Sequence, residues 1–274
     1  MLIETLSTFP HMYDSVMGES MMKRAQEKGI LEFRAHDLRD WTHDRHRTTD
    51  DDPYGGGAGL VMKCDPIFEA VEAILGKEFV EAKLAAAPPQ GESQQRSSAA
   101  PQIVFLAPQG RPFDDAYADK LAAADHLLFI CGHYEGIDER VYALADHVIS
   151  LGDYVLTSGE LASMVVIDAA VRKLPGVLGA AEGPVDESFT SGLLEYPQYT
   201  RPADFRGMRV PEVLTSGNHA AIARWRREQS LARTAAARPD LIAAAEAADL
   251  LTPADQKFLK LLEPASTGAV EGVS

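Results

Sequence analysis

The first half of the chain alternates short apolar runs with amphipathic stretches. The apolar runs predict strands over residues 2–9, 30–38, 103–107, 126–131 and 147–151. Helical spacing of apolar residues predicts helices over residues 14–28, 65–83, 114–124, 139–145 and 158–173. Short buried strands that alternate with helices are typical of a parallel sheet covered on both faces. The pattern therefore predicts an α/β domain over residues 1–174.

The pattern changes after this domain. Residues 175–199 are interrupted by Gly and Pro and carry several acids, among them Asp186 and Glu187, which indicates an interdomain linker. Residues 200–264 show helical spacing and no strand signal, so we expect a small all-helical second domain, followed by a disordered tail at 265–274. The Ala-, Pro-, Gln- and Ser-rich stretch at 85–102 indicates a flexible insertion, to which we assign no role.

Composition adds a contrast in charge. The 274 residues carry a net charge of −15, which argues against general affinity for nucleic acids, DNA included. Residues 201–238 reverse this balance, because they contain eight Arg and three acidic residues and so carry a net charge of 8 − 3 = +5. A basic module on an acidic body is typical of a polyanion-binding protein. The alternative is an ordinary Arg-rich helical surface.

The remaining composition excludes several classes. Cys64 and Cys131 have neither a CxxC nor a metal-ligand spacing, so we expect no disulfide framework and no zinc site. No basic residue near Cys131 favours a thiolate, and a buried cysteine at a strand end is the better interpretation. The N-terminus lacks a signal peptide and no window could span a membrane. We therefore expect a cytoplasmic protein without a membrane partner.

The segment at residues 42–59 holds two His, two Arg, four Asp and four Gly. It has neither helical nor alternating periodicity, which predicts a loop, and its alternating charges suit a mutually paired network. Charged loops on a rigid scaffold are frequent sites of binding and catalysis, although a solvated surface loop is the alternative. Its glycines would let backbone amides approach a ligand closely. They match neither GxGxxG nor the phosphate-binding P-loop.

Three glycine-containing loops follow buried strands, at residues 107–110, 131–136 and 151–159. Ligands of open α/β sheets bind at this edge, so the loops predict a pocket whose backbone groups suit a planar edge such as adenine. Ordinary tight turns are the alternative. Thr157 to Glu160 forms a capping-box pattern at the start of the next helix. Further along, Arg172 is placed either to pair with Asp168 or to point into the pocket.

These segments, with several others in the same order, closely resemble the bacterial tRNA (guanine-N1)-methyltransferase family, TrmD, of the SPOUT methyltransferases. The resemblance covers about residues 1–262 apart from the insertion. The segments are THDRHRTTDDDPYGGGAG, LAPQGRPF, CGHYEGIDERV, SLGDYVLTSGEL, PGVLG, Ser188-Phe189, GLLEYPQYTRP and VLTSGNHAAIARWRREQSLART.

The resemblance implies a SPOUT-type parallel sheet with a deep trefoil knot, an obligate homodimer with a shared active site, and S-adenosylmethionine bound in the knotted loops. The substrate would be tRNA, methylated at N1 of the guanosine at position 37, and the second domain would help to hold it. The cofactor positions would be Leu106, Ala107, Pro108, Gln109, Gly132, Tyr134, Glu135, Gly136, Leu151, Gly152, Asp153, Tyr154, Val155, Leu156, Ser158 and Gly159. The substrate positions would be His46, Arg47, Asp50, Gly59, Arg201 and Arg224.

The resemblance also implies a mechanism. Guanine N1 must lose its proton before it can attack, so a carboxylate base and a cation at O6 are required. Arg172 matches the cation. In the family, the base is an Asp of the other subunit that lies just before the Ser-Phe pair. This chain has Asp186-Glu187 before that pair. The type of side chain favours Asp186 as the base, and the alignment register favours Glu187. Magnesium is a reported requirement of the family, but no ligand cluster in the sequence demands a site.

Two other functions remain open at this point. A SPOUT enzyme that methylates a ribose 2′-hydroxyl has less need of a linker carboxylate. A catalytically silent RNA-binding protein of the same fold would have no need of Arg172, the linker acids or all three cofactor loops.

Overall fold

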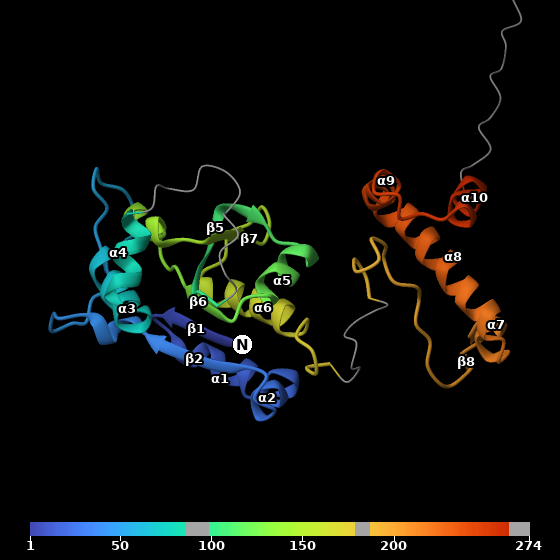
Figure 1. Cartoon of the computed structure of the whole chain (residues 1–274), viewed down its shortest axis with the longest axis horizontal. Helices are drawn as coiled ribbons and strands as arrows, with labels where there is room; N and C mark the ends of the chain where they lie inside the picture. Colours follow the sequence, from blue (N-terminus) through green and yellow to red (C-terminus); the bar gives the residue numbers. More distant parts are fainter. Residues whose placement is uncertain (86–98, 179–186, 263–274) are drawn as a thin grey trace, which may run out of the picture. The chain divides into compact units, whose positions relative to one another are not determined.

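The computed structural model describes residues 1–85, 99–178 and 187–262. The chain divides into two compact units, Met1–Gly183 and Pro184–Ser274, and the division falls inside the segment predicted as a linker (Figure 1). Most of the predicted flexible insertion, the predicted tail and Asp186 lie outside the described residues.

The first unit is built on a parallel sheet, which confirms the predicted α/β class. The five strands follow the order β2-β1-β6-β5-β7, and every pair is parallel. Their bounds are Leu2–Ser7 for β1, Glu32–Asp37 for β2, Gln102–Pro112 for β5, His126–Ile130 for β6 and His147–Ser150 for β7.

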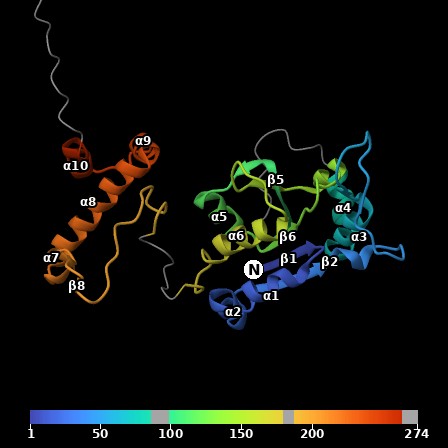
Figure 2. The ribbon, with the colours of Figure 1, turned by 180° about the vertical axis from the view of Figure 1, so that it is seen from behind.

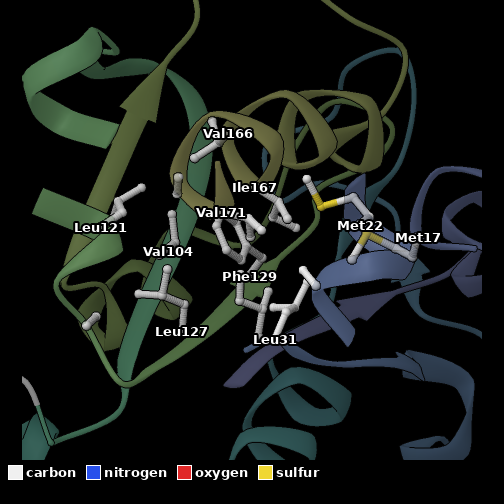
Figure 3. Close-up of a cluster of buried hydrophobic side chains, with 14 of the residues drawn as sticks. Met17, Met22, Leu31, Val104, Leu121, Leu127, Phe129, Val166, Ile167 and Val171 are labelled. Atoms are coloured by element: carbon white, nitrogen blue, oxygen red, sulfur yellow. The ribbon is translucent and has the colours of Figure 1, made fainter. Parts of the chain in front are cut away.

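Alternation along the strands divides the core into two layers. In β6, Leu127 and Phe129 face one cluster, and Leu128 and Ile130 face the other. The first cluster is covered by α1 (Asp14–Met17), α2 (Ser20–Glu27), α5 (Asp115–Ala122) and α6 (Gly159–Val171), as Figure 3 shows for part of it. The second is covered by η2 (Leu38–Trp41), α3 (Cys64–Leu75), α4 (Lys77–Ala85) and η3 (Glu139–Leu144); both layers can be followed in Figures 1 and 2. Helices on both faces explain why the central strands carry apolar residues on both sides.

Glycines divide two of the predicted helices. Instead of one helix over 65–83, α3 ends at Gly76, whose φ of +97° suits glycine, and α4 begins at the next residue. Instead of one helix over 14–28, the structure has η1 (Pro10–Tyr13), α1 and α2, with Gly18 closing α1. The predicted helix over 139–145 is the 3₁₀ helix η3.

Two predicted loops contain strand structure. Residues 107–110 form an irregularity inside β5, because Leu106 and Arg111 both pair with Ile149 of β7. The charged segment 42–59 includes β3 (Asp50–Asp51), which pairs antiparallel with β4 (Val61–Met62). Both features were missed because runs this short have no periodicity to detect.

The regular structure described in the second unit is helical apart from one β-hairpin. Its helices are α7 (Glu212–Thr215), α8 (His219–Ala237), α9 (Pro239–Ala247) and α10 (Pro253–Leu262), and its core contains Leu193, Leu231, Ala245 and Leu251. The expectation of an all-helical unit was wrong, because β8 (Asp204–Phe205) and β9 (Met208–Arg209) form a hairpin. Arg206 and Gly207 both have positive φ, as a two-residue hairpin turn requires.

Candidate active site

The three predicted loops converge on one pocket at the carboxyl ends of β5, β6 and β7. Its volume is about 320 Å³, within the usual range for small-molecule sites. All of the sequence-predicted cofactor positions line it except Asp153. They are Leu106, Ala107, Pro108, Gln109, Gly132, Tyr134, Glu135, Gly136, Leu151, Gly152, Tyr154, Val155, Leu156, Ser158 and Gly159.

The start of α6 is pressed against the loop that follows β6. The amide N–H of Gly159 donates to the carbonyl oxygen of Gly132 at 2.8 Å. A Cβ at Gly159 would lie 2.7 Å from the backbone nitrogen of Gly132 and 3.0 Å from Cα of Cys131. Only glycine permits this backbone approach. Cys131 itself is fully buried, as predicted, and burial raises the pKa of its thiol to about 12, which disfavours the thiolate that a nucleophile needs.

A buried carboxylate lies below the pocket, and sequence reasoning missed it. Glu160 has no exposed surface; it accepts a hydrogen bond from Oγ of Ser7, and its Oε2 lies 2.7 Å from Nε2 of His133. His133 lines the pocket, with its ring centroid 4.9 Å from that of Phe9. The predicted capping box is therefore wrong. Ser158 is the N-cap, its side chain makes no capping bond, and Glu160 turns to a tertiary partner instead.

The pocket wall offers unsatisfied hydrogen-bonding capacity and exposed rings. Oγ of Ser158 is buried and has no hydrogen-bond partner among the described residues. A buried hydroxyl without a partner is costly, and a ligand could satisfy it. Tyr134 and Tyr154 line the same pocket and are half-exposed, at 51% and 58%. Together with the backbone groups of three loops, these features fit a small molecule that combines a planar ring with polar edges.

The charged segment is ordered by its own side chains. Asp44 accepts from the amides of His46 and Thr48 and from the Thr48 hydroxyl, and the hydroxyl contact is the largest cause of its lowered pKa. Arg47 pairs with Asp40. His43 likewise pairs with an acid outside the segment, Glu69, so the expected network is only partly internal.

The end of the charged segment is fastened to the pocket. A Cβ at Gly59 would lie 2.4 Å from Cγ of Glu135, and the Glu135 amide donates to the carbonyl of Leu60 at 3.1 Å. The Met62 amide donates to the carbonyl of Gly136 at 3.0 Å. The structure thus brings the predicted substrate position Gly59 next to the predicted cofactor position Glu135. His46 and Arg47 are exposed on the same segment.

The other predicted site residues lie elsewhere. Arg172 is the half-buried C-cap of α6, and its amide donates to the Asp168 carbonyl at 3.1 Å. Gly159 begins that helix, and 13 residues at about 1.5 Å each place Arg172 roughly 20 Å from it. Arg172 does not line the pocket of its own chain, so the interpretation that it points into that pocket was wrong.

The second unit carries the remaining predicted positions. Glu187 is half-buried, and Arg201 and Arg224 are exposed. Within the described ranges, no group of three His, Cys, Asp or Glu side chains is placed to hold a metal ion, so the magnesium requirement stays a prediction. No helix of the described residues is long and apolar enough to cross a membrane.

Comparison with known proteins identifies the family. The family model for tRNA (Guanine-1)-methyltransferase TrmD matches residues 1–244. A tRNA (guanine-N(1)-)-methyltransferase of Symbiobacterium thermophilum is 52% identical over 260 residues, which are 95% of this chain and 97% of the relative. One of Limosilactobacillus reuteri is 51% identical over 246 residues, which are 90% and 91% of the two chains. The chain therefore belongs to the TrmD family of tRNA (guanine-1)-methyltransferases.

Proposed function

We propose that this protein transfers the methyl group of S-adenosylmethionine to N1 of the guanosine at position 37 of tRNA. The observation that carries the proposal is the pocket at the sheet edge, which is joined through Gly59 and Glu135 to the charged segment. A site for a methyl donor and a site for its RNA acceptor would thereby lie side by side. Membership of a tRNA methyltransferase family supports the same reaction.

The residues of the pocket fit the methyl donor. Backbone groups of the irregular stretch of β5 at residues 107–110 and of the loops after β6 and β7 would bond its adenine edge and its amino-acid end, and the Ser158 hydroxyl would gain its missing partner. Tyr134 and Tyr154 would cover its rings. When bound, the group supplies an electrophilic methyl on a sulfonium. The fixed loops would hold the reacting atoms in line, and such positioning contributes much of the rate of a transfer.

The chain must also make N1 a nucleophile. Asp186 or Glu187, the two acids at the start of the second unit, would accept the N1 proton. The guanidinium of Arg172 would stabilise the negative charge that grows on O6 as the proton leaves. Side-chain type favours Asp186 and register favours Glu187, so both are candidates.

In a homodimer, Arg172 of each subunit would lie at the pocket of the other subunit. Leu161, Val165, Asp168 and Arg172 follow helical spacing on one face of α6, and the two apolar members are 44% and 54% exposed. If two copies of α6 pack antiparallel about a twofold axis near Val165, the partner subunit's Arg172 lies opposite Gly159, where the pocket begins. The exposed apolar face would be covered by the same contact. We therefore propose an active site shared between two subunits.

Two further expectations belong to this proposal. A deep trefoil knot would require close backbone contacts between these segments, and the double pairing of β5 with Ile149 and the contact of Gly159 with Gly132 support that expectation. The Arg-rich second unit, with Arg201 and Arg224, would hold the tRNA through its phosphates.

The test is methyl transfer from labelled S-adenosylmethionine to a tRNA with guanosine at position 37, with a matched tRNA carrying adenosine as control. The expected product is N1-methylguanosine from the first tRNA alone. Asp186→Asn and Glu187→Gln then identify the base, since only one should abolish turnover while preserving tRNA binding. Label on a ribose would support the 2′-O-methyltransferase instead. Tight tRNA binding with no transfer would support the silent RNA-binding protein.

A further inference from the structure

The second unit contains a separate pocket of about 410 Å³ that no step of the reaction uses. It is formed by the extended segment at residues 196–203 together with residues of α7 and α8. Its lining is Tyr196, Pro197, Gln198, Tyr199, Thr200, Arg201, Ala203, Val210, Leu214, Thr215, Ile222, Trp225 and Arg226. The volume lies within the usual range for small-molecule sites.

Aromatic rings are concentrated in this pocket. Tyr199 is 49% exposed, and its ring centroid lies 6.4 Å from that of Trp225 at an interplanar angle of 51°. The guanidinium of Arg226 lies over the ring of Tyr196, 4.7 Å from its centroid. The arrangement leaves Tyr199 with accessible ring surface instead of burying it in the core. Proteins that bind single-stranded RNA commonly stack unpaired bases on accessible aromatic rings and on the planes of arginine guanidinium groups.

The electrostatics of the pocket are one-sided. Among the described residues, its lining includes Arg201 and Arg226 and no carboxylate. Two acids near it are engaged by other groups: Glu195 accepts from the Gln198 amide, and Glu228 lies 3.6 Å from Arg224. A ligand with an aromatic ring and a negative charge would therefore find both of its features matched.

We propose that this pocket binds an unpaired nucleobase of the RNA substrate, with the base stacked on the exposed ring of Tyr199 and packed against Trp225, whose ring is tilted by 51° to it. Arg201 and Arg226 contact the phosphates on either side of that nucleotide. The inference rests on the proposed RNA substrate and goes beyond it. The Arg cluster alone predicts contacts to the phosphate backbone only, whereas the pocket adds a site that requires a splayed-out base. Paired bases have no free face to offer it.

The first test is the Kd for tRNA, measured by filter binding at fixed salt. Tyr199→Ala and Trp225→Ala should weaken binding by roughly tenfold each, as expected for a lost stacking contact. Tyr199→Phe and Trp225→Phe should restore most of the affinity. Phe205→Ala is the matched control, because Phe205 is an exposed aromatic residue of the same unit, 52% exposed, outside the pocket lining. Equal affinity of Tyr199→Ala and wild-type protein would overturn the inference.

Salt dependence separates stacking from phosphate contact. Arg226→Gln should lower the slope of log Kd against log salt by about one, whereas Tyr199→Ala should leave the slope unchanged. A single abasic substitution, moved through the unpaired positions of the tRNA, should weaken wild-type binding strongly at one position. At that position, Tyr199→Ala should bind abasic and normal tRNA equally. A uniform response across positions would overturn the proposed base site.

Methyl transfer distinguishes this inference from the function on which it rests. If wild-type protein methylates tRNA and Tyr199→Ala has an unchanged KM for tRNA, the function stands and the base site is refuted. If wild-type protein binds tRNA through Tyr199 but transfers no methyl group, the base site stands and the catalytic proposal fails. The affinity of Tyr199→Ala for S-adenosylmethionine alone should equal that of the wild type.

Discussion

Replacing Gly159 by Ala should damage both the fold of the first unit and its pocket. The new Cβ would lie 2.7 Å from the Gly132 nitrogen, and its neighbours are backbone atoms. Atoms in good contact are about 3.5 Å apart, so one backbone segment would have to move by roughly 0.8 Å. Overpacking of this kind costs about 1–3 kcal/mol, and the higher helix propensity of Ala returns at most about 1 kcal/mol. The midpoints of these two ranges give an expected net loss of about 1.5 kcal/mol.

The assay is urea unfolding followed by tryptophan fluorescence in a Trp225→Phe background, in which Trp41 alone reports on the first unit. Calorimetry of S-adenosylmethionine binding should show an affinity about tenfold weaker, which corresponds to about 1.4 kcal/mol.

Gly132→Ala is the control for this substitution. Its Cβ would meet only the flexible side chain of Ile137, at 3.3 Å, so the loss of stability should stay below about 1 kcal/mol. Equal losses of stability in Gly132→Ala and Gly159→Ala would refute the argument from backbone crowding, as would an unchanged stability of Gly159→Ala.

Three further perturbations test the interior of the first unit by the same unfolding assay. Burial lowers the pKa of His147 from 6.5 to about 4, so below pH 6.5 this side chain takes up a proton in the unfolded chain but stays neutral in the folded protein. The free energy of unfolding should therefore fall by up to about 3 kcal/mol as the pH drops from 6.5 to 4. His147→Gln should remove that part of the pH dependence. Glu160→Gln should cost about 1.5–3 kcal/mol, because the buried carboxylate that accepts from Ser7 loses its charge; no loss would mean that the charge is not needed there. Lys83→Met should cost about 3–5 kcal/mol by removing the ammonium that pairs with the buried Asp146 carboxylate, and adding Asp146→Asn, which removes the charge but keeps an acceptor for the Ile103 amide, should recover part of the loss.

Periodicity was sufficient to predict the sheet and its two layers of helices, because each central strand carries apolar residues on both faces. The helix breaks at Gly18 and Gly76 escaped prediction since one glycine costs a helix only about 1 kcal/mol while the apolar spacing continues across it. The β8–β9 hairpin was not predicted because each of its strands has only two residues.

The candidate site was partly predictable for a similar reason. Glycines after apolar strands predict loops at one edge, and those loops do converge. The role of Glu160 was not predictable, since a capping box and a buried acid have the same local sequence; its partner Ser7 is 153 residues away. Arg172 was misplaced because the sequence pattern defines the face of α6 on which it lies, whereas its position 13 residues after Gly159 removes it from the pocket at the start of that helix.

The charged segment and the pocket loop after β6 belong to the same unit, and backbone contacts join them. Met62 forms a parallel bridge with Ile137, and the Asp138 amide donates to the Met62 carbonyl at 3.0 Å. The segment that would present the acceptor is therefore held by the same loop that would hold the donor. Methyl transfer requires two reacting atoms to be placed within a fraction of an ångström, which separate mobile loops could not ensure. A Cβ at Gly59 would overlap the Glu135 side chain, and the φ of +85° also favours glycine, so we expect Gly59→Ala to displace Glu135 from its place beside this segment.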